Sequence, residues 1–525
     1  MATKSDEYQH PIQEQLAEIE YCPNDSPSWP EAIGLGFQHY VTNLGITVLI
    51  PTMLVYQMGG DNRDKVRVIQ TLLFVNGLNT LFQTSFGSRL PVVMGGSFAF
   101  LIPTVSIINS SKLQAIYDDR ERFLHTMREV QGALIIASSV QIILGFSGLW
   151  AIVLKFITPL ALAPVIGLVG IGLYGYGFPG VAKCVETGIP ELILLIIVSQ
   201  FLKRLKTRKV PLFERFPVIF SLIIIWAYAH ILTIGGAYRH SSPKARIHCS
   251  TDRAHLVDAA PWVRIPYPLE WGAPTFNAGH AFAMMASALV AQIESTAAFY
   301  GVSRIANATP PPTFIVGRGV GWQGIGILLD GLFGTLTGSA VSVENAGLVG
   351  ITRVGSRRTV QIAAVFMIFF SIFGKFGGII ASIPQPMFAA VFCVLDGFFA
   401  AVGISLLQFT NLNLPRNLFI LGFTFFMGIS IPQYFLEFQM TTEHGPVHTA
   451  ASWFNDILNT IFSSHIAVAF IIAILLDNTL RYGATKKDRG MTWWKRYHKW
   501  KDCATNEEFY KLPFNLNKYF PPPQI

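Results

Sequence analysis

Long runs of apolar residues, separated by short polar stretches, follow one another along most of the chain. A helix that crosses the hydrocarbon core of a bilayer, which is about 30 Å thick, needs roughly 20 mainly apolar residues. The pattern therefore predicts an all-α polytopic membrane protein with about fourteen membrane-spanning segments. The predicted spans are residues 31–57, 67–88, 91–109, 131–149, 151–175, 188–203, 213–235, 278–301, 317–337, 339–353, 359–379, 383–406, 416–434 and 460–481.

Composition and charge support a membrane protein. Of the 525 residues, 51% are hydrophobic and only 13% are charged, whereas soluble domains carry roughly 25% charged residues. We interpret the net charge of +8 as loop charge that sets membrane orientation, and we expect no nucleic-acid partner. The sequence has no Walker loop, no zinc-type cysteine spacing and no nucleophile–base pair within the spans, so we expect neither an enzyme nor a bound metal or cofactor.

Three basic stretches set the expected orientation, namely residues 203–209, residues 353–358 and the tail after Leu480. With an even number of spans all three lie on one side, which the positive-inside rule assigns to the cytoplasm together with both chain ends. Segment 110–130 carries basic residues and yet falls outside in this scheme. Because the N-terminus is polar up to about Ser28, we expect the first span to act as the targeting signal, with the plasma membrane as destination.

Two cysteines, Cys184 and Cys249, fall in loops on the expected outer side, the second of them within the long polar segment 237–277. An oxidising compartment outside the cell favours disulfide formation. A Cys184–Cys249 disulfide and two unpaired thiols are therefore the two alternatives.

Two spans are interrupted in the same way. "PVVMGGSFAFLIP", residues 91–103, and "GSAVSVENAGL", residues 338–348, each contain a Gly–Ser step and a few residues that we interpret as extended. Paired interruptions in corresponding halves of a chain are typical of inverted-repeat transporters, whose binding site lies where the broken helices meet. The alternative is that glycine, with 45 of 525 residues, is simply common in these helices.

Ionisable residues are rare in membrane spans, so each one is a candidate for function. Those in the predicted spans are His39, Lys155, Glu294, Asp330, Glu344, Lys375 and Asp396. We expect Lys155, Lys375 and Asp396 to lie near span ends, where snorkelling or short loops explain them. For Asp330, a packing or capping role and a functional role are both open.

Glu294 and Glu344 are the strongest candidates. Small and apolar residues surround Glu294, so its carboxyl group is expected to exchange a proton or, alternatively, to bond a neighbouring helix. Glu344 lies at the second interruption, where a new half-helix offers free N–H groups, and it also suits the N-terminal cap of that half-helix. Phe98 at the first interruption offers an aromatic ring. For His39, beside Gln38, hydrogen bonding between helices is favoured over titration.

These residues resemble a known family. "QH" at 38–39, "GGSFAF" at 95–100 and "ENAGLVGITR" at 344–353 are similar to segments of the nucleobase–ascorbate transporter family, also called nucleobase:cation symporter 2. The family signature is Gln, Glu or Pro, then Asn, one residue, Gly, four residues, Thr, and finally Arg, Lys or Gly. Here it is met by Glu344, Asn345, Gly347, Thr352 and Arg353. The segment "TDRAHLVDAAPWVRIPYP", residues 251–268, is similar to plant members.

The resemblance implies two inverted repeats of seven spans, with short extended segments in spans 3 and 10. A core domain would comprise residues 31–149 and 278–380, and a gate domain residues 150–236 and 381–482. Residues 1–30 and 483–525 would be cytoplasmic, and 237–277 an outer loop. Members of the family are typically homodimers that move substrate by an elevator motion of core against gate.

The resemblance also implies residue roles. Glu294 would bind a nucleobase, Glu344 would bind its other edge, and Phe98 would stack on the ring. The further expected residues are Ser97 and Val343 beside the substrate, Asn345 and His39 as organisers of the site, Gln38 as a structural residue, and Thr352 and Arg353 as selectivity residues at the end of span 10. Proton coupling is expected to involve Glu294 and His39.

Two positions depart from other family members. Ala298 stands where a bacterial uracil carrier has a histidine, so proton coupling rests more on Glu294. Gly324 stands where a fungal xanthine–urate carrier has an aspartate, and that role is not transferred to Asp330.

Glu at the first signature position favours a particular substrate class. Ionised carboxylates only accept hydrogen bonds, so two of them suit bases with N–H groups on two edges and repel the ascorbate anion. We therefore expect a proton-coupled symporter of purines or uracil. The alternatives are a sodium-coupled ascorbate or xanthine/urate carrier of the same family and, less favoured, an anion exchanger or channel of the related sulfate/bicarbonate type.

Overall fold

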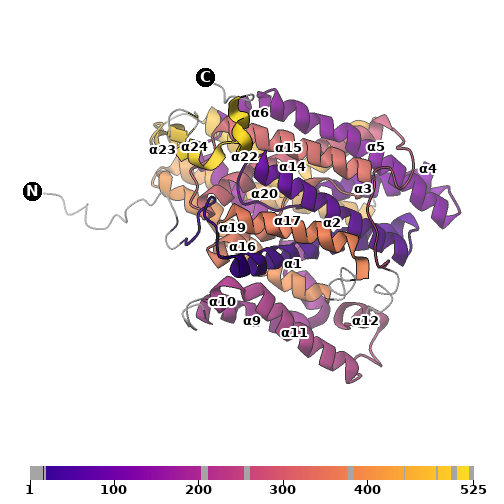
Figure 1. Ribbon diagram of the computed structural model, residues 1–525. Coiled ribbons are helices and arrows are strands. Elements are labelled where there is room, and N and C mark those ends of the chain that lie inside the picture. The colour runs from indigo at the N-terminus through magenta and orange to yellow at the C-terminus, as the bar shows by residue number, and fades with distance from the viewer. Residues whose placement is uncertain are drawn as a thin grey trace, which may run out of the picture.

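The computed structural model describes residues 16, 19–202, 211–252, 260–375, 383–442, 444–480, 483–497, 500 and 505–518. These residues form a bundle of helices that run in both directions, with one small antiparallel pair of strands (Figure 1). Predictions that fall on the remaining residues, such as the basic stretch 203–209, lie outside the described residues.

Helices before residue 250 make up the first half of the bundle. They are α1 (Trp29–Leu54) continued by η1 (Val55–Met58), α2 (Asn62–Ser85), η2 (Phe98–Phe100), α3 (Leu101–Ile108), α4 (Ser111–Gln114), α5 (Asp119–Phe146), α6 (Leu149–Leu154), α7 (Pro159–Ile171), η3 (Tyr174–Tyr176), α8 (Phe178–Val181), η4 (Ala182–Cys184), α9 (Val185–Ile196), η5 (Ile197–Phe201), α10 (Leu212–Arg215), α11 (Pro217–Ile234) and α12 (Pro243–Cys249).

Helices of the second half follow the loop before residue 278. They are α14 (Ala278–Ile305), α15 (Thr313–Phe333), α16 (Val343–Thr352), α17 (Arg357–Ile372), α19 (Gln385–Ser405), η7 (Leu406–Phe409), α20 (Pro415–Thr442), α21 (Ser452–Phe462), α22 (His465–Thr479), α23 (Met491–Trp494), η8 (Lys495–Tyr497), α24 (Thr505–Tyr510) and η10 (Pro513–Lys518).

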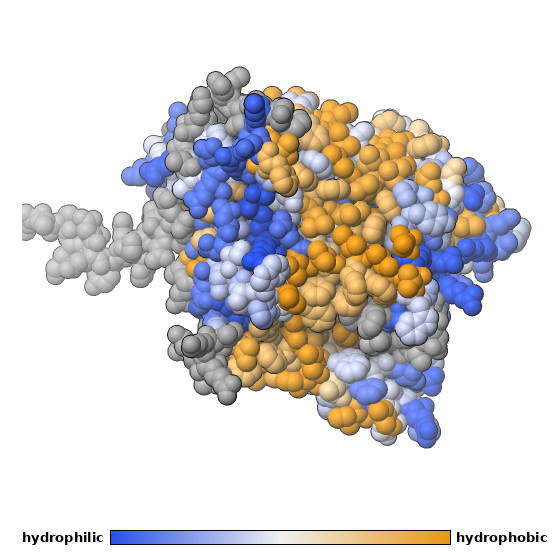
Figure 2. Space-filling model, in the orientation of Figure 1, coloured by the Kyte–Doolittle hydropathy of each residue, from blue (hydrophilic) through white to orange (hydrophobic). Residues whose placement is uncertain are grey.

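Several helices of the described chain have the length and composition of membrane spans. Six meet both criteria: α1 with η1, α5, α11, α14, α19 with η7, and α20; the pair α21 and α22, bent by 82°, makes a possible seventh. Apolar side chains cover the middle of the face in Figure 2, with hydrophilic ones toward the end that holds α23 and α24 and toward the end that holds α4. The chain is therefore a multi-pass membrane protein, and the larger number of about fourteen spans stays a prediction.

Some predicted spans contain breaks. The span expected at 151–175 is divided, because α6 ends before Lys155 and Thr158 caps a new helix that begins at Pro159. The span expected at 460–481 begins in α21 and passes the bend before α22. The span expected at 416–434 is longer, since α20 continues to Thr442.

The two extended segments predicted at the interruptions are both present. β1 (Met94–Gly96) and β2 (Ser339–Val341) pair antiparallel, with Gly95 opposite Ala340. Each strand leads into a helical segment, η2 and α3 after β1 and α16 after β2. The two helix starts therefore meet in the interior of the bundle.

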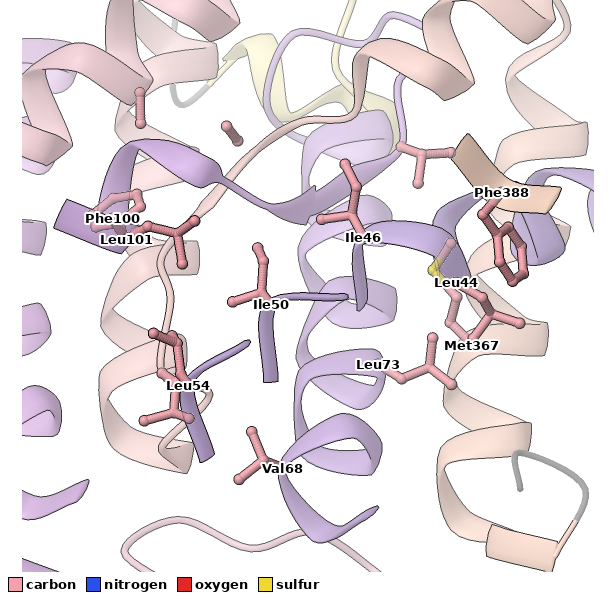
Figure 3. Packing of buried hydrophobic residues seen from close by; sticks show 14 of the residues in the cluster. Leu44, Ile46, Ile50, Leu54, Val68, Leu73, Phe100, Leu101, Met367 and Phe388 are labelled. Atoms are coloured by element: carbon pink, nitrogen blue, oxygen red, sulfur yellow. The ribbon is translucent and has the colours of Figure 1, made fainter. Parts of the chain in front are cut away.

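Apolar side chains from helices far apart in the sequence fill that interior. Leu44, Ile46 and Ile50 of α1 lie among Leu73 of α2 and Met367 of α17 (Figure 3), and all five are nearly inaccessible to solvent. Within a membrane, van der Waals contacts between such closely packed side chains stabilise the association of the helices. The packing fixes α1 and α2 against α17, and so holds β1 in register.

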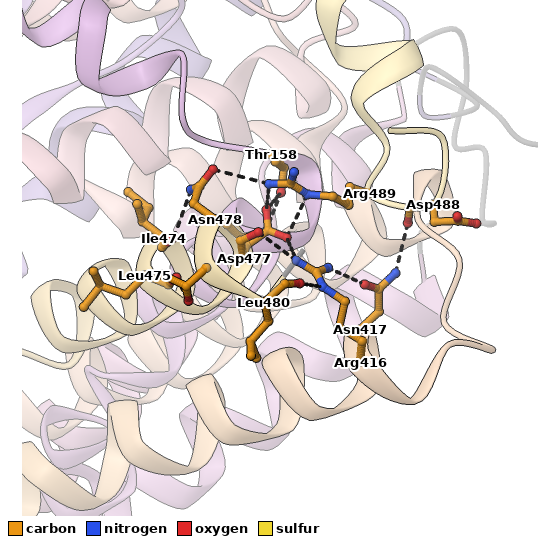
Figure 4. Close-up of polar contacts among 12 residues, drawn as sticks. Thr158, Arg416, Asn417, Ile474, Leu475, Asp477, Asn478, Leu480, Asp488 and Arg489 are labelled. Carbon is orange, nitrogen blue, oxygen red and sulfur yellow. Dashed lines mark hydrogen bonds and ion pairs between the residues drawn. The ribbon is translucent and has the colours of Figure 1, made fainter. Parts of the chain in front are cut away.

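A charged cluster ties the C-terminal tail to the helix ends. Asp477 of α22 has no accessible side-chain surface and forms ion pairs with Arg416 of α20 at 2.9 Å and with Arg489 of the tail at 2.8 Å (Figure 4). The hydroxyl of Thr158, at the start of α7, donates to the same carboxylate at 2.7 Å. Because the buried charge has several partners, removing one partner leaves others in place.

Asp488 continues this attachment. Its carboxylate accepts hydrogen bonds from the hydroxyl of Thr485 and the amide of Asn411. These bonds lower the pKa of the exposed Asp488 carboxyl to about 2. The carboxylate therefore stays charged, and the tail stays bonded to the loop before α20, throughout the physiological pH range.

The end of the described tail reaches other helices. Arg357 of α17 donates to the carbonyl of Phe509 at 2.9 Å, and Arg318 of α15 donates to the carbonyl of Tyr510 at 3.1 Å. Asn24, just before α1, donates to the carbonyl of Glu508 at 2.8 Å. The segment before α1 and the tail thus lie at the same end of the bundle.

Candidate substrate-binding site

The first broken helix brings a hydroxyl to Glu294. Ser97 follows β1, and its Oγ donates to a carboxylate oxygen of Glu294 on α14 at 2.9 Å. The same Oγ accepts from the N–H of Ala99 and so caps η2. The strand, the cap and the acid therefore form one unit, which brings the predicted residues Ser97 and Glu294 together.

At the second broken helix, Glu344 lies beside Ser342, the residue that caps α16. Ser342 Oγ donates to the Glu344 carboxylate at 2.9 Å and accepts from the backbone N–H of Asn345. The side-chain carbonyl of Asn345 is 2.9 Å from Nδ1 of His39 on α1. The N-terminal cap of α16 is thus Ser342, and the alternative interpretation of Glu344 as that cap is wrong. Val343, in the first turn of α16, is buried next to these groups.

Asp396 is a third acid at this place, which corrects the prediction that it lies near a span end. It is in the middle of α19, its side chain is 6% exposed, and its carboxyl group lies within electrostatic range of Glu344. Close packing explains the approach, because α16 and α19 meet at Gly347, where no side chain separates the helices. Glu344 is likewise within electrostatic range of Glu294.

Among the described residues, the three acids have no basic partner. Within the described ranges, Glu294, Glu344 and Asp396 form no ion pair with Lys, Arg or His. Like charges repel strongly where water is scarce. This arrangement is suited to taking up protons or other cations, or hydrogen-bond donors of a ligand.

An aromatic pair faces the same region. Phe98 of η2 stacks on Tyr176 of η3, with ring centroids 4.0 Å apart and planes 12° apart. Phe98 is partly exposed, whereas the neighbouring Ser97 is buried. A flat ligand that stacks on this face of Phe98 must displace Tyr176. No feature of the sequence indicated Tyr176, since the tyrosine is distant in the sequence from both interruptions.

Other predicted residues have structural contacts. Asp330 accepts hydrogen bonds from Ser339 of β2 at 2.6 Å and from Thr335 at 3.2 Å, which favours the packing role over a functional one. Gln38 joins α1 to the region of α10 and α11 through hydrogen bonds with the backbone of Arg215 and Ile219. These hydrogen bonds hold β2 in place, and Asp330 forms them without contact to the acid cluster.

Thr352 and Arg353 end α16 away from the acids. The carbonyl of Thr352 accepts from Arg215 at 2.8 Å, and Arg353 pairs with Glu214 at 3.0 Å.

Lys155 lies at the end of α6 as predicted, and Lys375 lies over the ring of Trp262, 5.9 Å from its centroid. Glu191 of α9 is a further fully buried acid that was not among the predicted candidates, although the rule for intramembrane acids applies to it.

The two cysteines of the predicted outer loops are joined. Cys184 of η4 and Cys249 of α12 form a disulfide, with Cα atoms 5.4 Å apart. Of the two alternatives left open by the sequence, the structure has the bridge. The bond holds α12 against the end of η4.

A cavity of about 920 Å³ opens beside α12. Its lining includes residues of α1 and α2 on one side and of η4, α11 and α12 on the other. The basic side chains are Lys65, Lys183, Arg239, Arg246 and His248, and Asp252 is the acid among the lining residues. The cavity is therefore strongly basic, in contrast to the acid cluster.

Together, two broken helices, a buried acid cluster and many apolar helices define a membrane transport protein of the broken-helix class. The model of a family described as the Permease family matches residues 30–437. The chain belongs to this family of transporters.

Relatives cover the whole chain. Nucleobase-ascorbate transporter 2 of Arabidopsis thaliana is 59% identical over 99% of both chains. Nucleobase-ascorbate transporter 1 of the same plant is 54% identical, over 98% of this chain and 99% of its own. The predicted family, the similarity to plant members and the prediction of a transporter rather than an enzyme are thus confirmed.

Solved structures with a related shape are more distant. The murine Solute Carrier 26 family member A9 anion transporter, in its inward-facing state, is 11% identical and covers 87% of this chain and 70% of its own, with a TM-score of 0.47. A score of this size transfers no residue and no mechanism to this chain.

Proposed function

We propose that the protein is a proton-coupled symporter of uncharged nucleobases, purines or uracil, that works by an elevator-type movement of the core domain against the gate domain. We place it in the plasma membrane as a homodimer, with both chain ends in the cytoplasm. The observation that carries the proposal is that Glu294 and Glu344, each bonded to the serine of a broken helix, lie within electrostatic range of each other. The names of the relatives contain both nucleobase and ascorbate, so they are compatible with this substrate class and equally with ascorbate.

The chemistry of a base fits these groups. Uracil, adenine, guanine and hypoxanthine present N–H donors on their edges, and carboxylates accept such bonds. The N–H groups in the first turn of α16 offer donors to ring carbonyls. Phe98 provides a flat apolar face, on which Tyr176 stacks in this structure. A planar heterocycle with donors on one side and acceptors on the other matches all three features.

Proton coupling follows from the acid cluster. Glu294, Glu344 and Asp396 lie in electrostatic range of one another in the membrane interior, so charging all three is unfavourable. Uptake of a proton by the cluster lowers this repulsion and leaves a neutral carboxyl group that donates to the substrate. His39 bonds Asn345, which favours an organising role for it over a proton-carrying one.

Uptake measurements test the proposal. The protein is expressed in cells without their own base carriers, and uptake of labelled uracil, adenine and guanine is measured with and without a proton gradient. We expect gradient-dependent uptake that Glu294→Gln abolishes. Glu129→Gln, which removes a buried acid of α5 that pairs with His280 of α14, is the matched control and should retain uptake. Ascorbate uptake without uptake of any base would overturn the proposal.

The second candidate is transport of an anion, ascorbate or the anionic form of xanthine or urate, with sodium as the coupling ion. The basic cavity favours it, because Lys183, Arg239 and Arg246 would concentrate anions near α1. Replacing these three side chains by Gln should raise the KM for an anionic substrate and make it less dependent on salt. An unchanged KM for anions would remove the support for this candidate.

A further inference from the structure

Arg215, the last residue of α10, is a large side chain buried far from the acid cluster. Its side chain is 1% exposed. It pairs with Glu31 at the start of α1 at 3.1 Å and with Glu20 in the segment before α1. It also donates to the carbonyl of Thr352 at the end of α16 at 2.8 Å. One guanidinium group thus holds three separate parts of the chain.

Those contacts join two parts of the molecule that the proposed mechanism requires to move. α10 precedes α11, within the predicted gate domain, whereas α1 and α16 belong to the predicted core domain. Gln38 adds two more hydrogen bonds across the same boundary, to the Arg215 carbonyl at 3.1 Å and from the Ile219 N–H at 3.2 Å. The end of α16 therefore cannot leave α10 unless these bonds break.

A neighbouring ion pair adds to the attachment. Glu214 of α10 lies 3.0 Å from Arg353, with the two side chains 10% and 23% exposed. Arg353 has a left-handed backbone, with φ 58°, and ends α16. A left-handed backbone favours glycine. The signature allows Gly as well as Arg or Lys at this position, which agrees with that backbone. We call Glu214 and Arg215, with their partners Glu31, Thr352 and Arg353, the α10 clasp.

We propose that the α10 clasp is the gate on the predicted cytoplasmic side: it closes the substrate site while formed and opens when the core moves. The inference rests on the proposed function, because it assumes that core and gate move past each other. Arg215 acts as a positioning residue, since it touches the end of α16 and not the acid cluster. Thr352 and Arg353 then influence selectivity through the ease of opening, without contact to the substrate.

Energetics support a gate that is closed but able to open. Charge-assisted hydrogen bonds are roughly twice as strong as neutral ones, and a charge left buried without partners is costly. On opening, water must replace the partners of Arg215. One of these partners, Glu20, is already half-exposed to water. Loss of the guanidinium group should therefore shift the equilibrium between closed and open forms by on the order of tenfold.

Cysteine labelling from the cytoplasmic side tests the clasp. Thr352 is fully buried. In Thr352→Cys protein whose Cys22, Cys393 and Cys503 are replaced by Ser, we measure the rate of reaction with a membrane-impermeant maleimide in inside-out vesicles. With Arg215 present the thiol should react slowly. Adding Arg215→Gln should raise the rate about tenfold, in line with the shift estimated above.

Two further variants keep the result interpretable. Arg353→Gly removes the Glu214 pair and suits the left-handed backbone, so it should raise the labelling rate by a smaller factor. Arg489→Gln is the matched control, because it removes another buried ion pair at the same end of the bundle while Arg416 still neutralises Asp477. It should leave the rate unchanged.

Several outcomes would overturn the clasp. Equal labelling in the presence and absence of Arg215 would do so, and so would an equal increase with Arg489→Gln, which would indicate general loosening. If Arg215→Gln does not fold, an unchanged rate in both Arg353→Gly and Glu31→Gln would decide against it. Labelling needs no substrate, so the expected rates together with absent base uptake would refute the proposed function and leave the clasp standing.

Discussion

Replacing Gly347 by alanine tests whether the close contact between α16 and α19 shapes the acid cluster. A Cβ atom at Gly347 would lie 2.3 Å from the carbonyl oxygen of Leu395 and 2.8 Å from its carbonyl carbon. Real Cβ contacts of this kind stay above 3.0 Å. The helices would therefore have to part by at least 0.7 Å, which is the 3.0 Å limit minus the 2.3 Å contact with the carbonyl oxygen. The obstacle is backbone, which cannot rotate away.

The expected cost follows from two opposing effects. Alanine in a helix gains up to about 1 kcal/mol over glycine, while forcing extra atoms into a packed interior costs about 1–3 kcal/mol. Gly397 on α19 provides the matched control, because a Cβ there would meet no atom within 4 Å. The helix-propensity gain is common to both variants, so the difference between them isolates the packing cost of about 1–3 kcal/mol.

Thermal unfolding and uptake kinetics measure the outcome. Gly347→Ala should unfold at a lower temperature than Gly397→Ala. It should also raise the KM for substrate, because Glu344 lies one turn before Gly347 and Asp396 follows Leu395, so parting the helices separates two of the three acids. Equal unfolding temperatures and equal KM values in the two variants would refute the reasoning.

Three further substitutions have expected outcomes. Ser97→Ala removes the hydrogen bond to Glu294, worth about 0.5–1.5 kcal/mol, and should raise the KM severalfold without changing expression; an unchanged KM would contradict the contact. Asp330→Asn should lower the unfolding temperature and leave the KM for substrate as it is, whereas a changed KM alone would restore a functional role. Cys184→Ser opens a loop of 65 residues closed by Cys249, which should destabilise the protein by up to about 4 kcal/mol in unfolding experiments; addition of reductant to the native chain should have the same effect.

Much of the site was predictable from local sequence, because a Gly–Ser step both interrupts a membrane helix and indicates extended backbone. Phe98 and Glu344 were identified in this way, and the structure places both at helix starts that meet across the β1–β2 pair. Asp396 was misjudged because a snorkelling argument considers the distance to a helix end and not the face of the helix. Which face a side chain occupies depends on the packing of α19 against α16, and one span alone does not reveal it.

Contacts between distant loops were beyond the sequence. Arg215 follows a basic stretch and would ordinarily be assigned to solvent, yet Glu31, Glu20 and Thr352 bury it. Breaks in the spans were also missed, since hydropathy is averaged over a window and does not register that Lys155 ends one helix and Pro159 begins the next. Hydropathy therefore identifies membrane segments better than it identifies their helices.

The tail has a consequence for synthesis. Arg318 and Arg357 are largely buried in helices made early in the second half, but the carbonyl groups that they bond belong to Tyr510 and Phe509, near the chain end. A ribosome must therefore add 192 residues after Arg318, and 152 after Arg357, before these two guanidinium groups obtain those acceptors. Membrane insertion can begin during translation, whereas final locking of this end of the bundle must wait until the tail has been made.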